Sequence, residues 1–552
     1  MASVLRRVCL SPRYARFFAL VLVLLLCLIF LVPHETRTFL PPSYPSFPTP
    51  QETPPLPSSE TDDILPPLYE RYTAFQDSFP QHDESLPFPE GSSAKFIYFA
   101  NQAWGAGWGN IMQQIVMNAQ LAYASGRTFV FDSYTWKRDG EYAEFNGKLI
   151  PSQIPLSALL AGPLIGYPYL NSTITTTHPR AVSWHYYNRV CPDPYILDPT
   201  DIMRALTLSA TALQTMNVWI DKIQSIEDRC IEIKKDSPQL FDIWLFGTPR
   251  LHNIMPTIMN SPIVKDFSWS PLIHYAFQKN LHHFTSSDLV PRTSLKNILF
   301  SYFSRNRGYY GDGREFALSP TPPTTKNDSL PLLAIHLRRG DFIQHCDTLV
   351  TWNSTYHGYN TLPSLPDRFF AENSTLLDIL PKEELQKRYR EKCFVDVDSA
   401  RKRVVKVVRE WRAERLKIEA EKNKDELLGT LEAKVKKMLR KVYIMTNGDP
   451  EFLQELKIAL HSDTHRSSSS PFNLNSNSLS EYDYDFIWDW DAISTSRDLD
   501  LGWETKFVAQ AMDMYVGQRA EVFIGNGFSS LTANVVLMRV VAGVEPWRTR
   551  FW

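Results

Sequence analysis

The segment LLAIHLRRGDFIQ joins a run of apolar residues to side chains that bind anions. His336, Arg338, Arg339 and Asp341 follow the apolar run within a few residues of one another. A guanidinium is permanently charged and forked, so at the end of a strand it suits a bidentate anion such as a phosphate. The alternative is a structural ion pair, for instance between Arg338 and Asp341. The segment by itself leaves both interpretations open.

Two further apolar runs end in small polar residues. KVYIMTNGD, at 441–449, contains Asn447, and AEVFIGNGFSS, at 520–530, ends in Ser529 and Ser530. The second run precedes the helix-like LTANVVLMRVV, and the N-terminus of a helix binds anions through its backbone amides and dipole. Three strand ends of this kind predict one ligand crevice at the carboxyl edge of a parallel sheet.

A similar unit opens the body of the protein. The strand-like KFIYFA, at 95–100, leads into the glycine-rich turn NQAWGAGWGN, which ends with Gly109 and Asn110. A helix-like run and the strand-like TFVFDSY follow. This order predicts a Rossmann-like unit. The glycines do not fit G-x-G-x-x-G, so no dinucleotide-binding fingerprint is present.

Three other groups of residues could bind a metal or a sugar. WDWD at 488–491 and YDYD at 482–485 resemble the D-x-D motif whose carboxylates bridge a divalent cation to a diphosphate. Chance matches to D-x-D are common, and the segment abuts a serine-rich loop. His282, His283 and His345 lack metal-ligand spacing, so we expect no metal. Trp104 and Trp108 could stack on a sugar, although an aromatic residue there is as often part of a core.

Four segments in order resemble the superfamily of fucosyltransferases that use GDP-fucose, which includes the protein O-fucosyltransferases and the α1,6-fucosyltransferases. HLRRGDF is similar to the family's H-x-R-x-G-D motif, and WGNIMQQIVMNAQLAYASGRTFVF is similar to the start of the protein O-fucosyltransferases. VYIMTNGDPEFLQELK resembles a family strand and helix in which Asp is commoner than Asn447. FIGNGFSSLTANV resembles the serine-rich segment that cradles phosphates. Long stretches, including 150–331, are unmatched.

The resemblance implies a GT-B-like α/β architecture, with two Rossmann-like domains facing a cleft, and an inverting transfer of fucose without a cofactor. Arg338 would hold the β-phosphate and neutralise the leaving group, and Asn110 would lie beside the sugar or acceptor. Asp341 would orient the arginines. The general base has no candidate, because the opening turn offers only amides. The residues implied to bind the nucleotide sugar are Gly109, His336, Arg338, Gly340, Asp341, Asn447, Ser529 and Ser530.

The N-terminus predicts a membrane anchor. Four arginines at 6–16 precede FFALVLVLLLCLIFLV, at 17–32, which lacks charge and is about the length of a short membrane span. No small-residue cleavage site follows, and the charge asymmetry predicts a type II orientation with a cytosolic tail at 1–16. A short span suits Golgi or ER membranes. The proline-rich segment 33–93 predicts an extended stem.

The sequons and cysteines agree with the prediction that the body of the protein is lumenal. Sequons begin at Asn171, Asn327, Asn353 and Asn373, all beyond the anchor. Four cysteines follow the anchor, and pairing of neighbours would join Cys191 to Cys230 and Cys346 to Cys393, one of three connectivities. A formal net charge of -2 gives no indication of nucleic-acid binding.

The body divides at a polar, proline-containing connector. We predict an N-terminal Rossmann-like domain at 94–320, on the acceptor side, and a C-terminal one at 321–552, on the nucleotide-sugar side. A charged insertion at 381–440 predicts one or two solvated helices with apolar positions such as Val404, Val408, Trp411, Leu427 and Leu431. The function predicted is transfer of fucose from GDP-fucose to a protein or glycan. The alternatives are a non-catalytic, lectin-like or scaffolding relative and a transferase that uses another sugar nucleotide.

Overall fold

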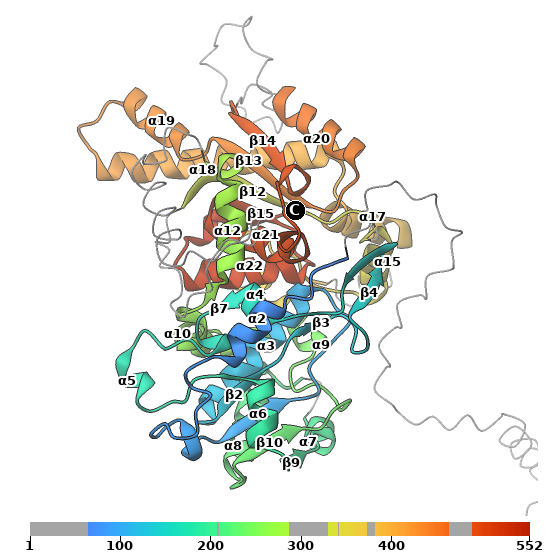
Figure 1. The fold of residues 1–552 in the computed structure, drawn as a ribbon. Coiled ribbons are helices and arrows are strands. Elements are labelled where there is room, and N and C mark those ends of the chain that lie inside the picture. Colours follow the sequence, from blue (N-terminus) through green and yellow to red (C-terminus); the bar gives the residue numbers. More distant parts are fainter. Residues whose placement is uncertain (1–64, 207–208, 286–328, 341, 372–380, 463–487) are drawn as a thin grey trace, which may run out of the picture. The chain divides into compact units, whose positions relative to one another are not determined.

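The computed structural model describes residues 65–206, 209–285, 329–340, 342–371, 381–462 and 488–552 (Figure 1). The predicted tail, anchor and first part of the stem lie outside these residues. In the described ranges no helix is both long enough and apolar enough to cross a membrane. The body from Leu65 to Trp552 forms one compact unit.

The first half of the body is built on a five-stranded parallel sheet. Its strand order is β8-β2-β1-β10-β9, and every neighbouring pair is parallel. Its strands are β1 (Phe96–Phe99), β2 (Thr128–Phe131), β8 (Val182–Ser183), β9 (Tyr195–Leu197) and β10 (Cys230–Ile233). The central strands are apolar along most of their length, as expected where helices cover both faces of a parallel sheet.

The second half repeats this plan. Its sheet has the order β14-β13-β12-β15-β16, again parallel throughout. Its strands are β12 (Leu330–Leu337), β13 (Lys441–Thr446), β14 (Ala492–Thr495), β15 (Ala520–Gly525) and β16 (Thr549–Phe551). The predicted α/β class with parallel sheets is therefore confirmed.

Helices surround the two sheets, and short antiparallel pairs join β3 to β6, β4 to β5 and β7 to β11. The short strands are β3 (Tyr134–Thr135), β4 (Tyr142–Phe145), β5 (Lys148–Pro151), β6 (Gln153–Ile154), β7 (Leu160–Ala161) and β11 (Ser268–Trp269). Helices of the first half are α3 (Trp108–Ala124), α4 (Leu156–Leu159), α5 (Ser172–Thr175), α6 (Trp184–Val190), α7 (Thr200–Ala205), α8 (Ala212–Gln224), α9 (Ile243–Phe246), α10 (Met255–Asn260), α11 (Pro262–Lys265), α12 (Pro271–Lys279) and α13 (Leu281–Phe284). Helices of the second half outside the charged insertion are α15 (Phe342–Thr351), α20 (Pro450–Ser462), α21 (Ala509–Arg519) and α22 (Ser530–Val541).

The two halves share elements across the predicted boundary. The connector at 320/321 lies outside the described residues, but α12 and α13, which precede it, contact the second half. Asn280, between these helices, donates a hydrogen bond to the main chain of Asp500 at 3.0 Å and accepts one from it at 2.7 Å. The composition of a connector indicates where the chain passes from one half to the other, but it does not indicate which sheet each neighbouring helix packs against.

The folded body begins earlier than composition predicted. The proline-rich composition predicts a stem that includes residues 65–93, but α2 (Glu70–Asp77) and a short 3-10 turn at 91–93 lie in this range. Tyr69 and Tyr72 are fully buried, and the Tyr69 hydroxyl donates to the main-chain oxygen of Glu504 at 2.6 Å. The prediction of a stem up to residue 93 is therefore wrong for residues 65–93. The prediction fails because it rests on proline content, whereas buried aromatic residues anchor this segment to the body.

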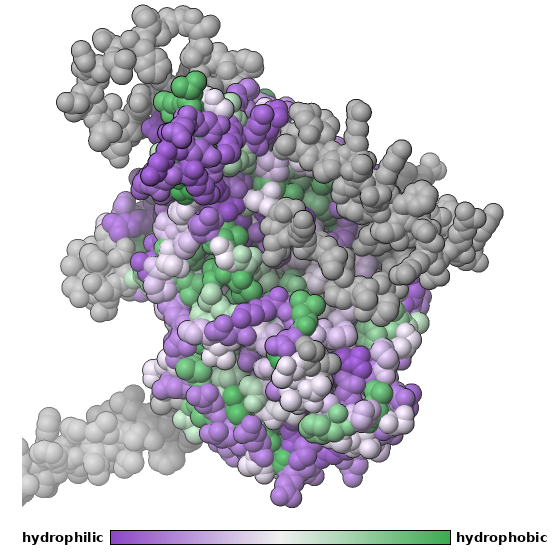
Figure 2. All heavy atoms as spheres, turned by 90° about the vertical axis from the view of Figure 1, so that its left-hand side faces the viewer, coloured by the Kyte–Doolittle hydropathy of each residue, from purple (hydrophilic) through white to green (hydrophobic). Residues whose placement is uncertain are grey.

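The charged insertion contains three helices rather than one or two: α17 (Lys382–Cys393), α18 (Val397–Lys422) and α19 (Leu428–Lys437). Of the apolar positions named above, Val404, Val408, Trp411 and Leu431 are buried, whereas Leu427 is 79% exposed. The α18 and α19 helices lie at the upper left of Figure 1, and the corresponding part of Figure 2 is mostly hydrophilic. The insertion thus joins the core on one side and meets solvent on the other.

Two disulfides join neighbouring cysteines. Cys191 pairs with Cys230 and Cys346 pairs with Cys393. The pairing of neighbours, one of the three connectivities open from the sequence, is confirmed. The second disulfide ties α15 to α17, close to the end of β12.

The early start of the fold predicts the outcome of truncation. Removal of residues 1–64 should leave the melting temperature within about 2 °C of the full chain. Removal of residues 1–93 should abolish cooperative folding, because loss of each buried aromatic side chain costs about 3–5 kcal/mol. Thermal melts followed by circular dichroism test both fragments, and Tyr72→Ala in the full chain serves as the single-residue comparison. Equal melting temperatures of the two fragments would contradict this assignment.

Candidate functional site

Three strand ends meet at one edge of the second sheet. β12 lies between β13 and β15, and all three are parallel, so their carboxyl ends point the same way (Figure 1). The turns after them carry Arg338, Asn447 and Ser529. The predicted convergence of the three polar strand ends is confirmed. Asp341 lies outside the described residues.

His336 fixes the end of β12 to helix α22. The side chain is 3% exposed, and its Nδ1 lies 2.8 Å from the Thr532 hydroxyl oxygen. Burial, followed by the neighbouring charge of Arg338, lowers the pKa of His336 to about 3. The imidazole is therefore neutral at physiological pH. Its main-chain oxygen accepts a hydrogen bond from the indole of Trp552 at 2.9 Å, so His336 is held from two sides.

The two adjacent arginines have different surroundings. The Arg339 guanidinium carbon lies 3.8 Å from the ring centroids of both Phe394 and Phe452, and its Nη1 donates to the Val395 oxygen at 3.0 Å. Burial lowers the pKa of Arg339. Arg338 is half-buried, with its guanidinium carbon 5.0 Å from the centroid of Phe342. Both arginines are half-buried, and what separates them is that Arg339 packs between two aromatic rings and bonds to the main chain of Val395.

Asn447 connects the turns that follow β12 and β13. Its side-chain oxygen accepts from the Arg339 amide at 2.8 Å, and its side-chain nitrogen donates to the Arg339 oxygen at 3.0 Å. Gly340 has φ +61°, a left-handed conformation that favours glycine. These two predicted binding residues therefore also have structural roles that shape the turn next to Arg338.

The N-terminus of α22 lies at the same edge. Ser529 is the N-cap residue, and its hydroxyl accepts a hydrogen bond from the Leu531 amide at 3.2 Å. Ser529 is 8% exposed, whereas Ser530 is half-buried. The first amides of a helix and its dipole favour an anion at this position.

Helix α3 of the first half begins against α22. A Cβ atom on Gly109 would lie 2.7 Å from the Ser530 hydroxyl oxygen and 2.8 Å from the Leu531 nitrogen. The Gly109 oxygen accepts from the Asn534 side chain at 2.8 Å. Asn110, the next residue, is half-buried and forms no hydrogen bond to another described side chain. The structure thus brings Gly109 and Asn110 to the helix start that carries Ser529 and Ser530.

Sequence reasoning missed a buried segment that supports this helix start. The main-chain amide of His357 and the side chain of Asn360 both donate to the Gly527 oxygen, at 2.9 and 2.8 Å. The His357 ring also lies 3.1 Å from the side-chain oxygen of Gln113 on α3. Asn360 is fully buried. The only signal for it in the sequence is a group of polar residues in HGYNT, which has no period and matches no motif.

A buried carboxyl group supports the end of β13. Tyr443 donates to Asp513 at 2.6 Å and Ser496 donates to it at 3.1 Å, while the amide of Thr446 donates to the Ser496 hydroxyl at 3.1 Å. Burial raises the pKa of Asp513 to about 7, although both hydrogen bonds oppose this shift. No signal in the sequence identified Asp513, because it lies inside helix α21, seven residues before the nearest motif, and no motif includes it.

The D-x-D-like segment is part of a packed region. Trp488 and Trp490 are buried, Asp489 pairs with Lys436 at 3.2 Å and Asp491 pairs with Arg440 at 2.7 Å. Among the residues that the structure describes, no group of three or more His, Cys, Asp or Glu side chains could hold a metal ion. The YDYD segment lies outside those residues.

The two tryptophans of the glycine-rich turn differ in exposure. Trp108 is 2% exposed and belongs to the core. Trp104 is 48% exposed, and the guanidinium carbon of Arg138 lies 5.0 Å from its ring centroid. Of the two, only Trp104 is open to a ligand.

Taken together, the edge can bind an anion. It combines a partly exposed guanidinium, a helix N-terminus with two serines, a neutral histidine and a half-buried amide at Asn110. Charge-assisted hydrogen bonds from such groups suit a phosphate or diphosphate.

No protein-family model and no curated protein matches the chain. Among solved structures, it is similar to POFUT1 in complex with GDP-fucose, with a TM-score of 0.38 and 14% identity over 83% of this chain and 97% of that one. POFUT1 in complex with GDP gives 0.36 and 14% over 83% and 98%. NodZ alpha-1,6-fucosyltransferase soaked with GDP-fucose gives 0.30 and 11% over 81% and 92%.

The buried Asp513 predicts a particular dependence of stability on pH. Its pKa is about 7 in the folded protein and 3.8 for an ordinary aspartate, so between these values only the folded state holds the proton. The contribution of Asp513 to stability is therefore largest below about pH 4 and falls as the pH rises to about 7. Asp513→Asn removes this dependence, and its free energy of unfolding relative to wild type should rise by about 4 kcal/mol between pH 4 and pH 8.

Chemical denaturation of both proteins at several pH values measures this difference. Tyr443→Phe, which removes one donor but keeps the carboxyl group, should retain a pH-dependent profile. Parallel profiles of wild type and Asp513→Asn would show that Asp513 titrates at its ordinary pKa.

Proposed function

We propose that the protein is a glycosyltransferase that transfers fucose from GDP-fucose to a hydroxyl group of a protein or glycan, with inversion. The observation that carries this proposal is the meeting of Arg338 with the serine-capped start of α22 at one sheet edge, beside Asn110 of the first half. The motif resemblance supports the same assignment, because its four segments supply these residues in the family's order.

In the proposed reaction, an acceptor oxygen bonds to the anomeric carbon of fucose as the bond from that carbon to the β-phosphate breaks. The departing GDP gains negative charge. Arg338, Ser529, Ser530 and the first amides of α22 stabilise this charge as it develops in the transition state. Asn110 orients the sugar or the acceptor. The acceptor proton passes to a base that we do not assign.

The proposal extends to architecture and location. We infer a GT-B-like arrangement, in which the first sheet contributes the acceptor side through α3 and the second contributes the donor side through α22. We also propose a type II Golgi or ER membrane protein with a lumenal body. The two disulfides support an oxidising compartment.

One observation favours a second donor. Asn447 gives both ends of its amide to the main chain of Arg339, which reduces its capacity to read a guanine edge. A transferase of the same mechanism with another sugar nucleotide is therefore the second candidate.

Because the two arginines have different roles, replacing each of them by lysine should have a different effect. Arg338→Lys keeps the charge but loses the fork, so turnover should fall by about 10²–10³ while the protein folds and still binds GDP. Arg339→Lys loses its place between two phenylalanine rings and its bond to Val395, so the melting temperature should fall while the folded fraction keeps near-normal turnover. Radiolabelled fucose transfer and thermal melts measure the two quantities.

Either of two results contradicts this division. Equal losses of turnover in both variants would indicate a shared clamp, and near-normal turnover in both would remove the arginine from the mechanism.

The proposed mechanism does not use a metal ion. Addition of EDTA should therefore change turnover by less than about two-fold. Asp489→Ala should also leave nucleotide affinity unchanged, since Asp489 pairs with Lys436 on the surface. Turnover that requires Mn²⁺ or Mg²⁺ and is lost on Asp489→Ala would instead favour the D-x-D interpretation.

A further inference from the structure

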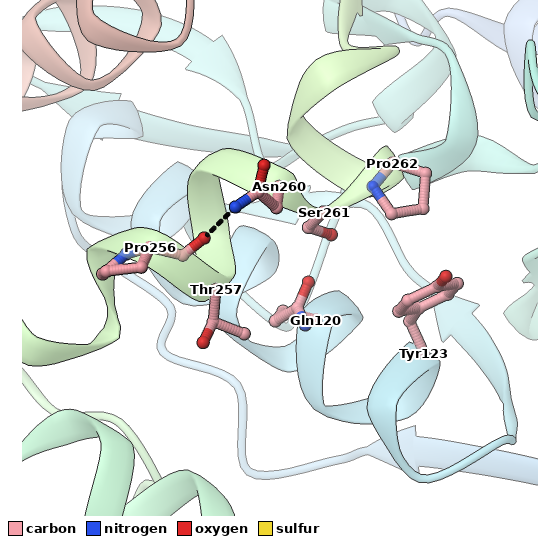
Figure 3. Close-up of a pocket in the computed structure, with 7 residues that line it drawn as sticks. All are labelled: Gln120, Tyr123, Pro256, Thr257, Asn260, Ser261 and Pro262. Atoms are coloured by element: carbon pink, nitrogen blue, oxygen red, sulfur yellow. Dashed lines mark hydrogen bonds between the residues drawn. The ribbon is translucent and has the colours of Figure 1, made fainter.

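An open hollow lies at the far end of helix α3 from the candidate site. It has a volume of about 410 Å³ and is formed where the last turns of α3 face α10 and α11 (Figure 3). This volume is within the range of about 300–1,000 Å³ typical of small-molecule sites. Its lining consists of Gln120, Tyr123, Pro256, Thr257, Asn260, Ser261 and Pro262.

The lining suits an uncharged, hydroxylated ligand. None of the seven residues is charged, and they offer two amides, three hydroxyls and the faces of an aromatic ring and two prolines. Gln120 is 3% exposed, and its side-chain oxygen is buried with no hydrogen-bond partner among the described residues. A buried acceptor without a donor costs about 1–3 kcal/mol, so a bound hydroxyl or amide group at this position would remove a penalty.

Tyr123 is held in place by the segment that carries a sequon. Its ring stacks on His178 with centroids 4.4 Å apart and lies 6.0 Å from Tyr169. The amide of Leu170, the next residue, donates to Asp266 at 2.9 Å, directly after α11. Asn171 of the sequon Asn171-Ser-Thr is exposed and follows Leu170 immediately. A chain attached to Asn171 therefore starts beside two of the elements that form the hollow.

We propose that Asn171 carries an N-linked glycan whose first N-acetylhexosamine lies in this hollow. The apolar face of the sugar packs on the ring of Tyr123, and a hydroxyl or acetamide N–H donates to the side-chain oxygen of Gln120. Because the glycan is covalently attached, its effective concentration at the hollow is of millimolar order, so a shallow site suffices. This inference needs the proposed lumenal location of the body but not the proposed transferase activity.

The structure distinguishes Asn171 from the other described sequon. Asn353 is half-buried, has φ +47°, and its side-chain oxygen lies 3.3 Å from the Tyr389 hydroxyl. The side-chain oxygen of Asn171 also accepts a hydrogen bond, from the Thr173 amide at 3.0 Å, so exposure is what separates the two sequons: Asn171 is exposed and Asn353 is half-buried. Asn327 and Asn373 lie outside the described residues.

The test begins with the full chain expressed in a secretory eukaryotic host. Mass spectrometry should find Asn171 occupied and Asn353 largely unmodified. Absence of a glycan at Asn171 in a chain that is modified elsewhere would overturn the inference. So would the absence of any glycan, which would also remove the lumenal location while leaving transferase activity to be measured separately.

Whether the first sugar lies in the hollow is tested by the rate at which an endoglycosidase releases the glycan from the native protein. Loss of one hydrogen bond, or of the ring contact, should speed release from Asn171 by about five-fold in Gln120→Leu and Tyr123→Ala, which corresponds to about 1 kcal/mol at 1.4 kcal/mol per factor of ten. Tyr195→Ala, at a half-exposed tyrosine of β9 outside the hollow, should release at the wild-type rate. Equal rates in all four proteins would overturn the proposal.

The effect of Gln120→Leu on the melting temperature can be separated from any general effect on folding by measuring it with and without the glycan. In the background Asn171→Gln, which has no glycan at this position, Gln120→Leu removes an unpartnered acceptor and should leave the melting temperature unchanged or raise it. In the glycosylated protein the same substitution should lower the melting temperature. The same sign in both backgrounds would contradict a bond between the glycan and Gln120.

Discussion

The close approach of α3 and α22 is the constraint on which the rest of the site depends. Gly109 has no side chain because Ser530 and the Leu531 amide occupy the space that a Cβ would need. The hydrogen bond from Asn534 to the Gly109 oxygen holds the two helix starts in register. As a result, one half of the body contributes Asn110 at the point where the other contributes the serine-capped N-terminus of α22. The segment around His357 and Asn360 supports this junction from beneath, through Gly527.

The paired arginines at the end of β12 divide two tasks that a single side chain could not perform. Arg339 is enclosed by two phenylalanine rings and anchors the turn through Val395, while Asn447 clamps its main chain. The two hydrogen bonds between Asn447 and the main chain of Arg339 hold this turn, and a lysine at position 339 would keep them, so the main chain next to Arg338 is fixed before a ligand arrives. Preorganised charge of this kind is what stabilises a developing anion, because the protein does not need to reorganise during the reaction.

The sequence predicted those features that depend on local pattern. Apolar runs identified β12, β13 and β15, and their shared parallel direction followed from the α/β order. The disulfides Cys191–Cys230 and Cys346–Cys393 could be proposed because these cysteines are neighbours in the sequence. The sequence could not exclude the other two connectivities. The proline content of residues 65–93 predicts an extended stem, so the sequence gives no sign that this segment is folded. The burial of Tyr72 depends on partners more than 80 residues away, which no local pattern reveals. Asp513 and Asn360 could not have been found, since their roles arise only when distant segments pack around them.

We propose that the edge formed by Arg338 and the start of α22 binds the diphosphate of a guanine nucleotide sugar. The most direct measurement is a calorimetric titration of the purified protein with GDP-fucose, GDP, GDP-mannose and UDP in the presence of EDTA. We expect GDP-fucose and GDP to bind with micromolar affinity and UDP to bind at least about ten-fold more weakly, a difference of about 1.4 kcal/mol. Absence of heat with every nucleotide, or equal affinity for UDP and GDP, would contradict the claim.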